Sequence, residues 1–364
     1  MVKHDGLVDK LVVTADGTGQ VGHAGSALLA GTADRVGLTG ALSEAMAPTR
    51  ERRSQHDPGV VLRDLVVTLA DGGECLSDIG ALRDQPDLFG GVASDSTAFR
   101  AIDSVDERCL ARLAEAVASA RARAWGLGAR PERTVLDVDA TLTAAQSDKE
   151  HAKGNFKGGY GHHPLLCYLD GSGEGLSGVL RAGNAGSNTA SDHTRVLDAA
   201  LGQLDRKALA GELLVRADGT ERERSQVCEI TDRLDLSGWP ERSRLIARRT
   251  LLKEGDQQSF ADHDGHRLAV FLSDQPGEHI PTLDLDHRGH ARVEDRIREG
   301  KDCGLGNLPF RSFAHNQVWL FLVLLAQDLI AWTKALCLKD EAAAWELKRL
   351  RYRYADLAVM PTLI

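Results

Sequence analysis

Apolar residues recur at intervals of three and four along the first third of the chain. Residues at these intervals share one face of a helix, so the pattern predicts helices at residues 26–47, 58–69, 95–104 and 107–124. Asp95 and Asp106 lie at the starts of the last two segments and are expected to cap them. Arginines at positions 50, 52 and 53 lie between the first two segments. This region is interpreted either as a small DNA-binding module or as a helical domain with a charged, solvated turn.

The pattern changes after residue 133. Short β-branched and apolar runs predict strands at residues 134–139, 164–169 and 175–180. An amphipathic helix at 191–209 and a fourth strand at 212–217 follow. Three strands, a helix and a further strand match the first part of a ribonuclease-H-like fold. Further along, strands are expected at 244–250 and 267–273, and helices from residue 290 onward.

The predicted fold class is therefore α/β. We expect a ribonuclease-H-like mixed sheet with an N-terminal helical domain, a β-rich insertion and C-terminal helices. The expected boundaries are 1–130 for the helical domain, 131–218 for the first part of the core, 219–286 for the insertion and 287–364 for the helices that complete the core.

Composition narrows the functional classes. A formal net charge of −9 over 364 residues gives no overall attraction to nucleic acid, so any DNA contact must come from local basic patches. Six scattered cysteines are expected to be free thiols in a reducing cytoplasm. The first ten residues lack the apolar run of a signal peptide, which favours a cytoplasmic location. The apolar stretch at 318–332 is too short to cross a bilayer and contains Gln327 and Asp328, so it is expected to form a buried core helix. The protein is therefore not expected to bind a membrane.

Three acids occupy positions suited to one site. Asp139 ends the first predicted strand, Asp218 follows the fourth, and Glu294 lies on the helix near residue 290. The first and fourth strands of a ribonuclease-H-like sheet are neighbours, so the two aspartates would meet, and a packed helix would add the glutamate. Carboxylate oxygens suit Mg²⁺ or Mn²⁺, and two such ions support in-line phosphoryl transfer. The alternative is that acids fall at strand ends by chance.

The helix around Glu294 carries further candidates. His287, His290, Arg298 and Lys301 lie at intervals of three and four from one another and from Glu294, which predicts one stripe. Such a stripe would place groups suited to phosphate beside a metal-binding acid. A solvated face of mixed charge is the alternative.

Other residues have two interpretations each. A glycine-rich connection offers DNA-phosphate contacts or a plain link between strands; its candidates are Lys153, Lys157, His162 and His163. His263 and His266 have a separation typical of metal ligands, but the sequence around them favours a turn over a zinc site. The three late tryptophans (Trp319, Trp332 and Trp345) are expected in the core. The late basic cluster suits DNA backbone or a solvated end; it comprises Lys348, Arg349, Arg351 and Arg353.

Four segments resemble the cut-and-paste DDE transposases of bacterial insertion sequences. They are LDVDATLT at 136–143, KGNFKGGYGHHPLLCYLD at 153–170, LLVRAD at 213–218 and HRGHARVEDRIREGKDCGLGNLPF at 287–310. The family pattern has a small residue and threonine after the first aspartate, which selects Asp139 over Asp137. It places the second aspartate at Asp218 and a glutamate seven residues before a lysine, at Glu294.

The chain also departs from that family pattern. His287 and His290 stand where the family signature has Tyr and Arg. The segment after Asp218 looks shortened, because the family has a helix and a further β-rich stretch at this junction.

The resemblance implies a transposase. Its activity would be Mg²⁺-dependent cleavage and strand transfer at the terminal inverted repeats of an insertion sequence. It implies catalysis by Asp139, Asp218 and Glu294, and DNA contacts by Lys301, Arg298, His290, His287, Lys157 and Lys153. The partners would be double-stranded DNA, both transposon ends and target, and a second copy of the chain on paired ends. An inactive DNA-binding remnant and a metal-dependent structure-specific nuclease are the alternatives. The sequence leaves open the end sequence, the target preference and whether this copy is active.

Overall fold

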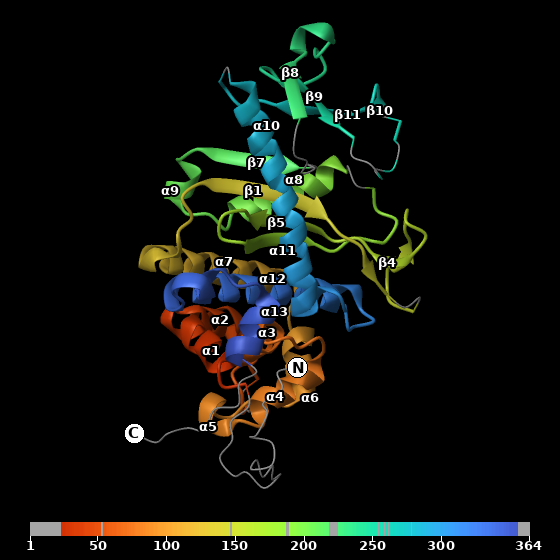
Figure 1. The fold of residues 1–364 in the computed structure, drawn as a ribbon. Helices are drawn as coiled ribbons and strands as arrows, with labels where there is room; N and C mark the ends of the chain where they lie inside the picture. Colours follow the sequence, from red (N-terminus) through yellow and green to blue (C-terminus); the bar gives the residue numbers. More distant parts are fainter. Residues whose placement is uncertain are drawn as a thin grey trace, which may run out of the picture.

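A four-stranded sheet with the order β6-β5-β1-β7 forms the centre of the computed structural model of the chain (Figure 1). β1 (Thr134–Ala140) pairs antiparallel with β5 (Leu165–Leu169), and β5 pairs antiparallel with β6 (Glu174–Val179). On its other side β1 pairs in parallel with β7 (Leu213–Ala217). The first and fourth strands of this sheet, β1 and β7, are neighbours as expected, and the predicted ribonuclease-H-like mixed sheet is confirmed.

The structure describes residues 23–355, apart from residues 52–53, 146–147, 187–188, 218–224, 253–254, 256, 258, 261 and 278. Three residues singled out in the sequence, Asp218, Arg52 and Arg53, lie outside the described residues.

Helices fill the N-terminal part of the chain, as predicted. They are α1 (Ser26–Arg35), α2 (Leu38–Met46), α3 (Pro58–Ala70), α4 (Gly80–Arg83), α5 (Pro86–Phe89), α6 (Asp95–Asp103) and α7 (Glu107–Ala124). The single helix expected at 26–47 is wrong, because Gly37 adopts a φ of 68° and separates α1 from α2. Asp106 caps α7 as expected, whereas α6 is capped by the Ser94 hydroxyl and not by Asp95.

The helix α12 (Phe313–Cys337) is buried between the N-terminal helices and the sheet. It packs on α3 and on β6, and its Trp319 and Trp332 are 0% and 1% exposed. α12 is long and apolar enough to cross a membrane, but 67% of its most apolar window is buried inside the protein. The predicted core helix is therefore confirmed. One continuous cluster of buried apolar side chains includes α12, the N-terminal helices and the central sheet.

The predicted helix at 191–209 consists of two pieces, α8 (Ala190–Leu201) and α9 (Arg206–Leu209). α8 packs on β5 and β6. α8 ends at Leu201, and the Asp205 side chain then caps α9 by accepting a hydrogen bond from the amide of Ala208.

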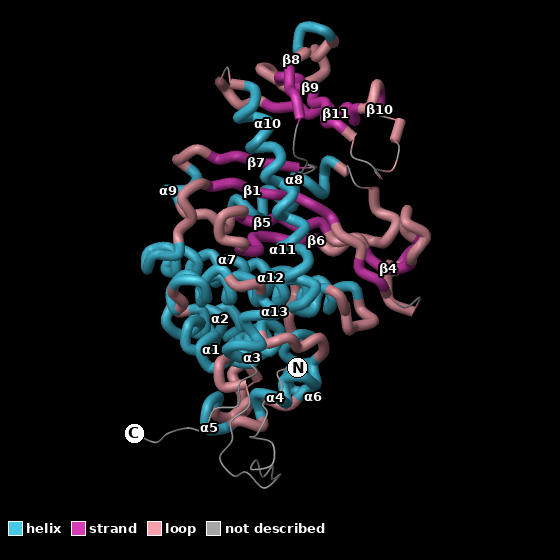
Figure 2. Tube along the Cα trace, viewed as in Figure 1, coloured by secondary structure: helices cyan, strands magenta, loops and turns pink. Residues whose placement is uncertain are grey.

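A second sheet follows β7, with the order β10-β11-β9-β8, and lies beyond the β7 edge of the central sheet (Figure 2). Its strands are β8 (Ser225–Glu229), β9 (Arg244–Leu251), β10 (Asp262–His263) and β11 (His266–Ser273). β9 and β11 were predicted, and β8 was missed. His263 pairs with His266 across the β10–β11 hairpin, which confirms the expected turn.

The chain returns from this second sheet through α10 (Ile280–Arg288), a short turn at Gly289–Ala291 and α11 (Arg292–Gly300). Together these segments cross the face of the central sheet (Figure 1). After α12 comes α13 (Leu347–Leu350). Short 3-10 or π turns complete the described helices at Ala47–Thr49, Leu76–Ile79, Trp125–Ala129, Thr231–Arg233, Lys301–Leu305, Asp340–Ala344 and Arg351–Ala355.

Candidate active site

Asp139 lines a cavity of about 550 Å³ at the C-terminal end of β1. Its carboxylate accepts the Ala140 amide at 2.7 Å. Ala217 lines the same cavity, because the parallel pairing of β1 with β7 sets Ala217 beside Val138. The cavity therefore lies where the chain leaves β7 toward Asp218.

The neighbouring acid Asp137 has a different environment. Its side chain is 2% exposed and accepts two hydrogen bonds from the Arg216 guanidinium on β7, each of 2.7 Å. Of the two aspartates in this strand, only Asp139 faces the cavity. The preference for Asp139 over Asp137 as a catalytic acid stays a prediction.

Glu294 is exposed in the first turn of α11, while Val293 and Ile297 of the same helix are buried. The segment just before α11 lies against Asp137, whose side chain is on the same face of β1 as that of Asp139. Glu294 does not line the Asp139 cavity. Over the part of the chain that the structure describes, no three His, Cys, Asp or Glu side chains form a metal-binding group. With Asp218 outside that part, the metal-binding triad stays a prediction.

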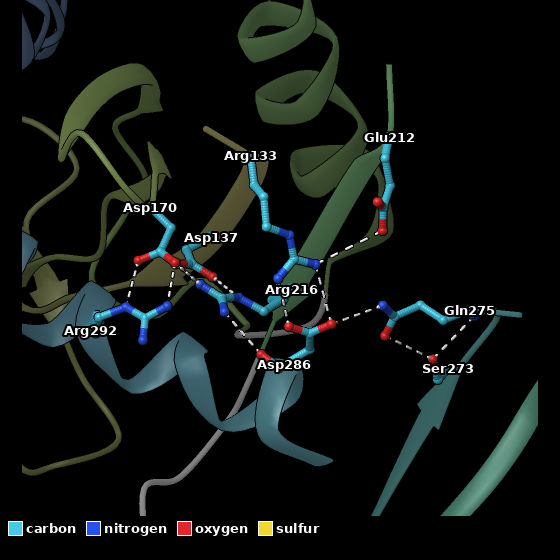
Figure 3. Close-up of polar contacts among 9 residues, drawn as sticks. All are labelled: Arg133, Asp137, Asp170, Glu212, Arg216, Ser273, Gln275, Asp286 and Arg292. Carbon is cyan, nitrogen blue, oxygen red and sulfur yellow. Dashed lines mark hydrogen bonds and ion pairs between the residues drawn. The ribbon is translucent and has the colours of Figure 1, made fainter. Parts of the chain in front are cut away.

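Asp137 belongs to a network of ion pairs that also includes Arg216, Asp170 and Arg292 (Figure 3). Arg216 also contacts Asp170 at 2.8 Å, and Arg292 of α11 donates to Asp170 at 2.7 Å. Burial alone would raise the pKa of Asp170, but hydrogen bonds and charge from Arg292 and Arg216 outweigh burial and hold that pKa below its usual range.

The two histidines of the predicted stripe have contacts inside the protein. His290 is 2% exposed, and its Nδ1 lies 3.1 Å from Asp137 Oδ1. His287 stacks on Phe271 of β11, with ring centroids 4.2 Å apart. These two side chains do not continue the solvent-facing stripe of Glu294 and Arg298, because the central sheet and the insertion cover them. The structure gives His290 a structural contact in place of the expected DNA contact.

Arg298 and Lys301 follow Glu294 along the chain. The Arg298 side chain is 57% exposed and pairs with Asp295 at 3.0 Å. Lys301 is half-buried at the start of the turn after α11.

A small sheet at the rim of the cavity presents the glycine-rich segment. It consists of β2 (Thr143–Ala144), β4 (Tyr160–His162) and β3 (Lys153–Gly154). Lys153 and Lys157 are exposed. Phe156 lines the cavity and is 73% exposed. The Asn155 side chain fixes the hairpin by accepting the amides of residues 157 and 159 at 3.0 Å each.

His162, the last residue of β4, and His163, which follows it, are buried. His163 lines the cavity, and its Nδ1 lies 3.0 Å from the Ala185 carbonyl oxygen. Burial is the main cause that lowers the pKa of His163. Sequence analysis missed Phe156, Asn184 and His193, which also line the cavity. The signal that could have marked Phe156 is a large apolar residue within KGNFKGG, where turn residues surround it.

A second cavity, of about 750 Å³, lies by the N-terminal end of β1 and has several arginines in its wall. Each of these arginines pairs with an acid: Arg130 with Asp205, Arg133 with Asp286, Arg216 with Asp137, Arg288 with Asp284 and Arg292 with Asp170. Since charge is balanced there, this cavity is not a strong anion site.

The late basic cluster is partly structural. Arg351 donates to the backbone oxygens of Ala70 at 2.8 Å and Leu69 at 3.1 Å, which are carbonyls at the C-terminal end of α3. Lys348 pairs with Asp302 at 3.3 Å. Arg349 lies over the Trp345 ring, at 4.6 Å from its centroid. The Arg351 contacts fit neither of the two interpretations given to this cluster.

Comparison with known proteins identifies the family. A family model described as transposase DDE domain group 1 matches residues 4–234 and residues 219–360. No curated protein matches the sequence. Among solved structures, a cryo-EM structure of a piggyBac transposase synaptic complex with hairpin DNA matches at 11% identity, over 92% of this chain and 80% of that chain, with a TM-score of 0.37. That structural likeness is too weak to bear on fold or function. Because the family model spans most of the sequence, the chain belongs to the DDE transposase family.

Proposed function

We propose that this transposase cleaves DNA at the terminal inverted repeats of an insertion sequence and transfers the freed strand to target DNA. Asp139, Asp218 and Glu294 are the proposed catalytic acids. The observation that carries the proposal is the position of Asp139 in a cavity at the C-terminal end of β1. The end of parallel β7 lines that cavity, and the segment just before α11 contacts Asp137, two residues before Asp139 on β1.

The donor chemistry of these acids fits Mg²⁺ or Mn²⁺. Both ions prefer carboxylate oxygens, and Mg²⁺ keeps room for water and phosphate when few protein ligands bind it. Asp139 reaches the cavity and Glu294 reaches solvent, so neither acid is buried behind apolar side chains. When bound, such ions would stabilise the attacking and leaving oxygens of phosphoryl transfer.

The proposed DNA surface runs from α11 across the cavity to the β3–β4 hairpin. Arg298 and Lys301 would contact phosphates on one side, and Lys153 and Lys157 on the other. Exposed Phe156 at the rim offers a ring face to a base. These local charges would act against a net charge of −9, so binding should depend strongly on salt. We also propose a homodimer on paired ends and keep the four domain boundaries given above as proposed.

Nicking of end-bearing DNA with Mg²⁺ or Mn²⁺ tests the assignment. We expect Asp139→Ala and Glu294→Ala each to abolish cleavage and to retain DNA binding in a gel-shift assay, because both remove a ligand and no phosphate contact. Asp295→Ala, which removes the adjacent exposed acid of α11, is the matched control and should still cleave. Unchanged cleavage by both test variants would rule out the proposed acids.

An inactive DNA-binding remnant is the second candidate. It is favoured by the junction after β7, where the family model matches in two parts that overlap at residues 219–234. β7 is also an edge strand of the described central sheet. End binding without nicking in either metal would support the remnant, whereas nicking that ignores the end sequence would indicate a nuclease.

A further inference from the structure

We propose that Arg216, together with Asp137 and His290, is a positioning cluster that sets the proposed metal-binding acids Asp139 and Glu294 relative to each other. This inference rests on the proposed function. It adds a role for residues that do not touch metal or DNA.

The Arg216 guanidinium joins its own strand, β7, to two other segments of the chain. Arg216 of β7 donates through Nε and Nη2 to the Asp137 carboxylate of β1, at 2.7 Å each. Its Nη1 donates at 2.9 Å to the backbone oxygen of Asp286 in α10. His290, in the turn between α10 and α11, lies 3.1 Å from Asp137 (Nδ1 to Oδ1). β1, β7 and the α10–α11 segment therefore meet at one buried point (Figure 3).

Each proposed acid is a short step along the chain from a member of this cluster. Asp139 is two residues after Asp137, and Asp218 is two residues after Arg216. Side chains two residues apart point to the same face of a strand, so the side chains of Asp137 and Asp139 lie on one face of β1. Glu294 is four residues after His290, about one helical turn. A second set of ion pairs joins the same segments at their other end, where Arg133, directly before β1, pairs with Asp286 of α10 at 3.0 Å and with Glu212, directly before β7, at 3.9 Å.

The cluster is rigid because it is buried and closely packed. The side chains of Arg216, Asp137 and His290 are 5%, 2% and 3% exposed. The backbone of the α10–α11 segment passes directly over the guanidinium at Gly289, where a Cβ would lie only 2.1 Å from Arg216 Nη1. Any side chain at this position would force the guanidinium or the helical segment to move.

Partners that hold metal ligands in place usually contribute about 10–100-fold to metal affinity or activity. Arg216→Lys keeps one positive charge beside Asp137 but cannot make the paired contact and reach Asp286 as well. We expect this variant to bind Mn²⁺ about 10-fold more weakly, measured by electron paramagnetic resonance on the protein without DNA. Gly289→Ala, which changes no charge, should weaken Mn²⁺ binding in the same direction.

Arg248→Lys is the matched control. Arg248 is also 5% exposed and pairs with a buried acid, Asp284, but it joins α10 to β9 and not to the central sheet. It should lower the thermal midpoint about as much as Arg216→Lys does and leave Mn²⁺ affinity unchanged.

The outcomes separate the two proposals. If the wild-type chain binds no Mn²⁺, or if Asp139→Ala binds it normally, the proposed function fails. If wild-type binding depends on Asp139 while Arg216→Lys and Gly289→Ala are folded and bind Mn²⁺ with wild-type affinity, the positioning role is wrong. Equal weakening in Arg248→Lys would also overturn it, because the effect would then reflect stability alone.

Discussion

Asp137 and Asp139 are only two residues apart on β1, yet their surroundings differ. Asp139 was selected from the sequence by its resemblance to a family pattern, and the structure places it in a cavity. The partners of Asp137 could not be found in this way, since Arg216 and His290 come from segments 79 and 153 residues away. Local sequence therefore identified the half-buried acid that lines the cavity but not the ion-pair network around Asp137.

The departures at His287 and His290 also have a cause at this scale. The helical intervals place both residues on one predicted stripe with Glu294. They could not show that β1 and β11 would cover them, because those contacts form only in the folded protein.

Buried His162 predicts a pH dependence of stability. Its Nε2 lies 2.9 Å from the Glu150 carbonyl oxygen, and burial is the main cause that lowers its pKa below 6.5. The unfolded chain therefore binds more protons than the folded chain near that pH. We expect the contribution of neutral His162 to the free energy of unfolding to be fully present above about pH 6.5. The free energy of unfolding should fall as the pH decreases below that value.

Urea unfolding at pH 7.5 and at pH 5.5 measures this change. His162→Gln keeps a hydrogen-bond donor and does not titrate, so it should show a smaller difference between the two pH values than the wild type. An identical difference in both proteins would contradict the assignment.

Among the elements, those with a strong apolar repeat were predicted well. α3, α6, α7 and the four strands of the central sheet lie within a few residues of their expected positions. β2, β3 and β4 are too short to produce a repeat, and they were missed. β8 has the sequence SQVCE, in which apolar and polar residues alternate only weakly, and a charged stretch precedes it.

The β3–β4 hairpin carries a prediction about DNA binding. Its turn is fixed by Asn155, so Lys157 is held at the rim of the Asp139 cavity without a large loss of backbone freedom on binding. We expect Lys157→Ala to reduce by about one the slope of log affinity against log salt concentration, since one phosphate contact is lost.

Fluorescence anisotropy of end-bearing duplex DNA over a series of KCl concentrations measures this slope. Lys339→Ala, at an exposed position just after α12, is the control and should leave the slope unchanged. Equal slopes for wild type and Lys157→Ala would remove the hairpin from the proposed DNA surface.

For the whole molecule, the N-terminal helices and the central sheet share one core around a buried charge. Arg121 of α7 is 0% exposed and pairs with Glu174 of β6 at 3.0 Å and with Asp328 of α12. Burial is the main cause that raises the pKa of Asp328 well above its usual range. In the sequence Arg121 resembles an ordinary basic residue in the last helical turn, so its burial could not be predicted.

Arg121→Met should lower the free energy of unfolding by about 3–5 kcal/mol, because it leaves two buried carboxyl groups without their cation. Guanidinium chloride denaturation measures the loss. Adding Glu174→Gln and Asp328→Asn to this variant should recover part of it. A loss below about 1 kcal/mol for the single variant would show that the arginine does not hold the two layers together.

The central position of α12 has a consequence for biosynthesis. Its partners α3 and β6 are translated long before it, and their apolar sides stay uncovered until residues 313–337 leave the ribosome. Folding of the transposase must then be completed at a late stage of translation. A chain truncated before α12 would expose the apolar surface that α12 covers and become a substrate for chaperones and proteases. Truncated chains should therefore not accumulate in the cell.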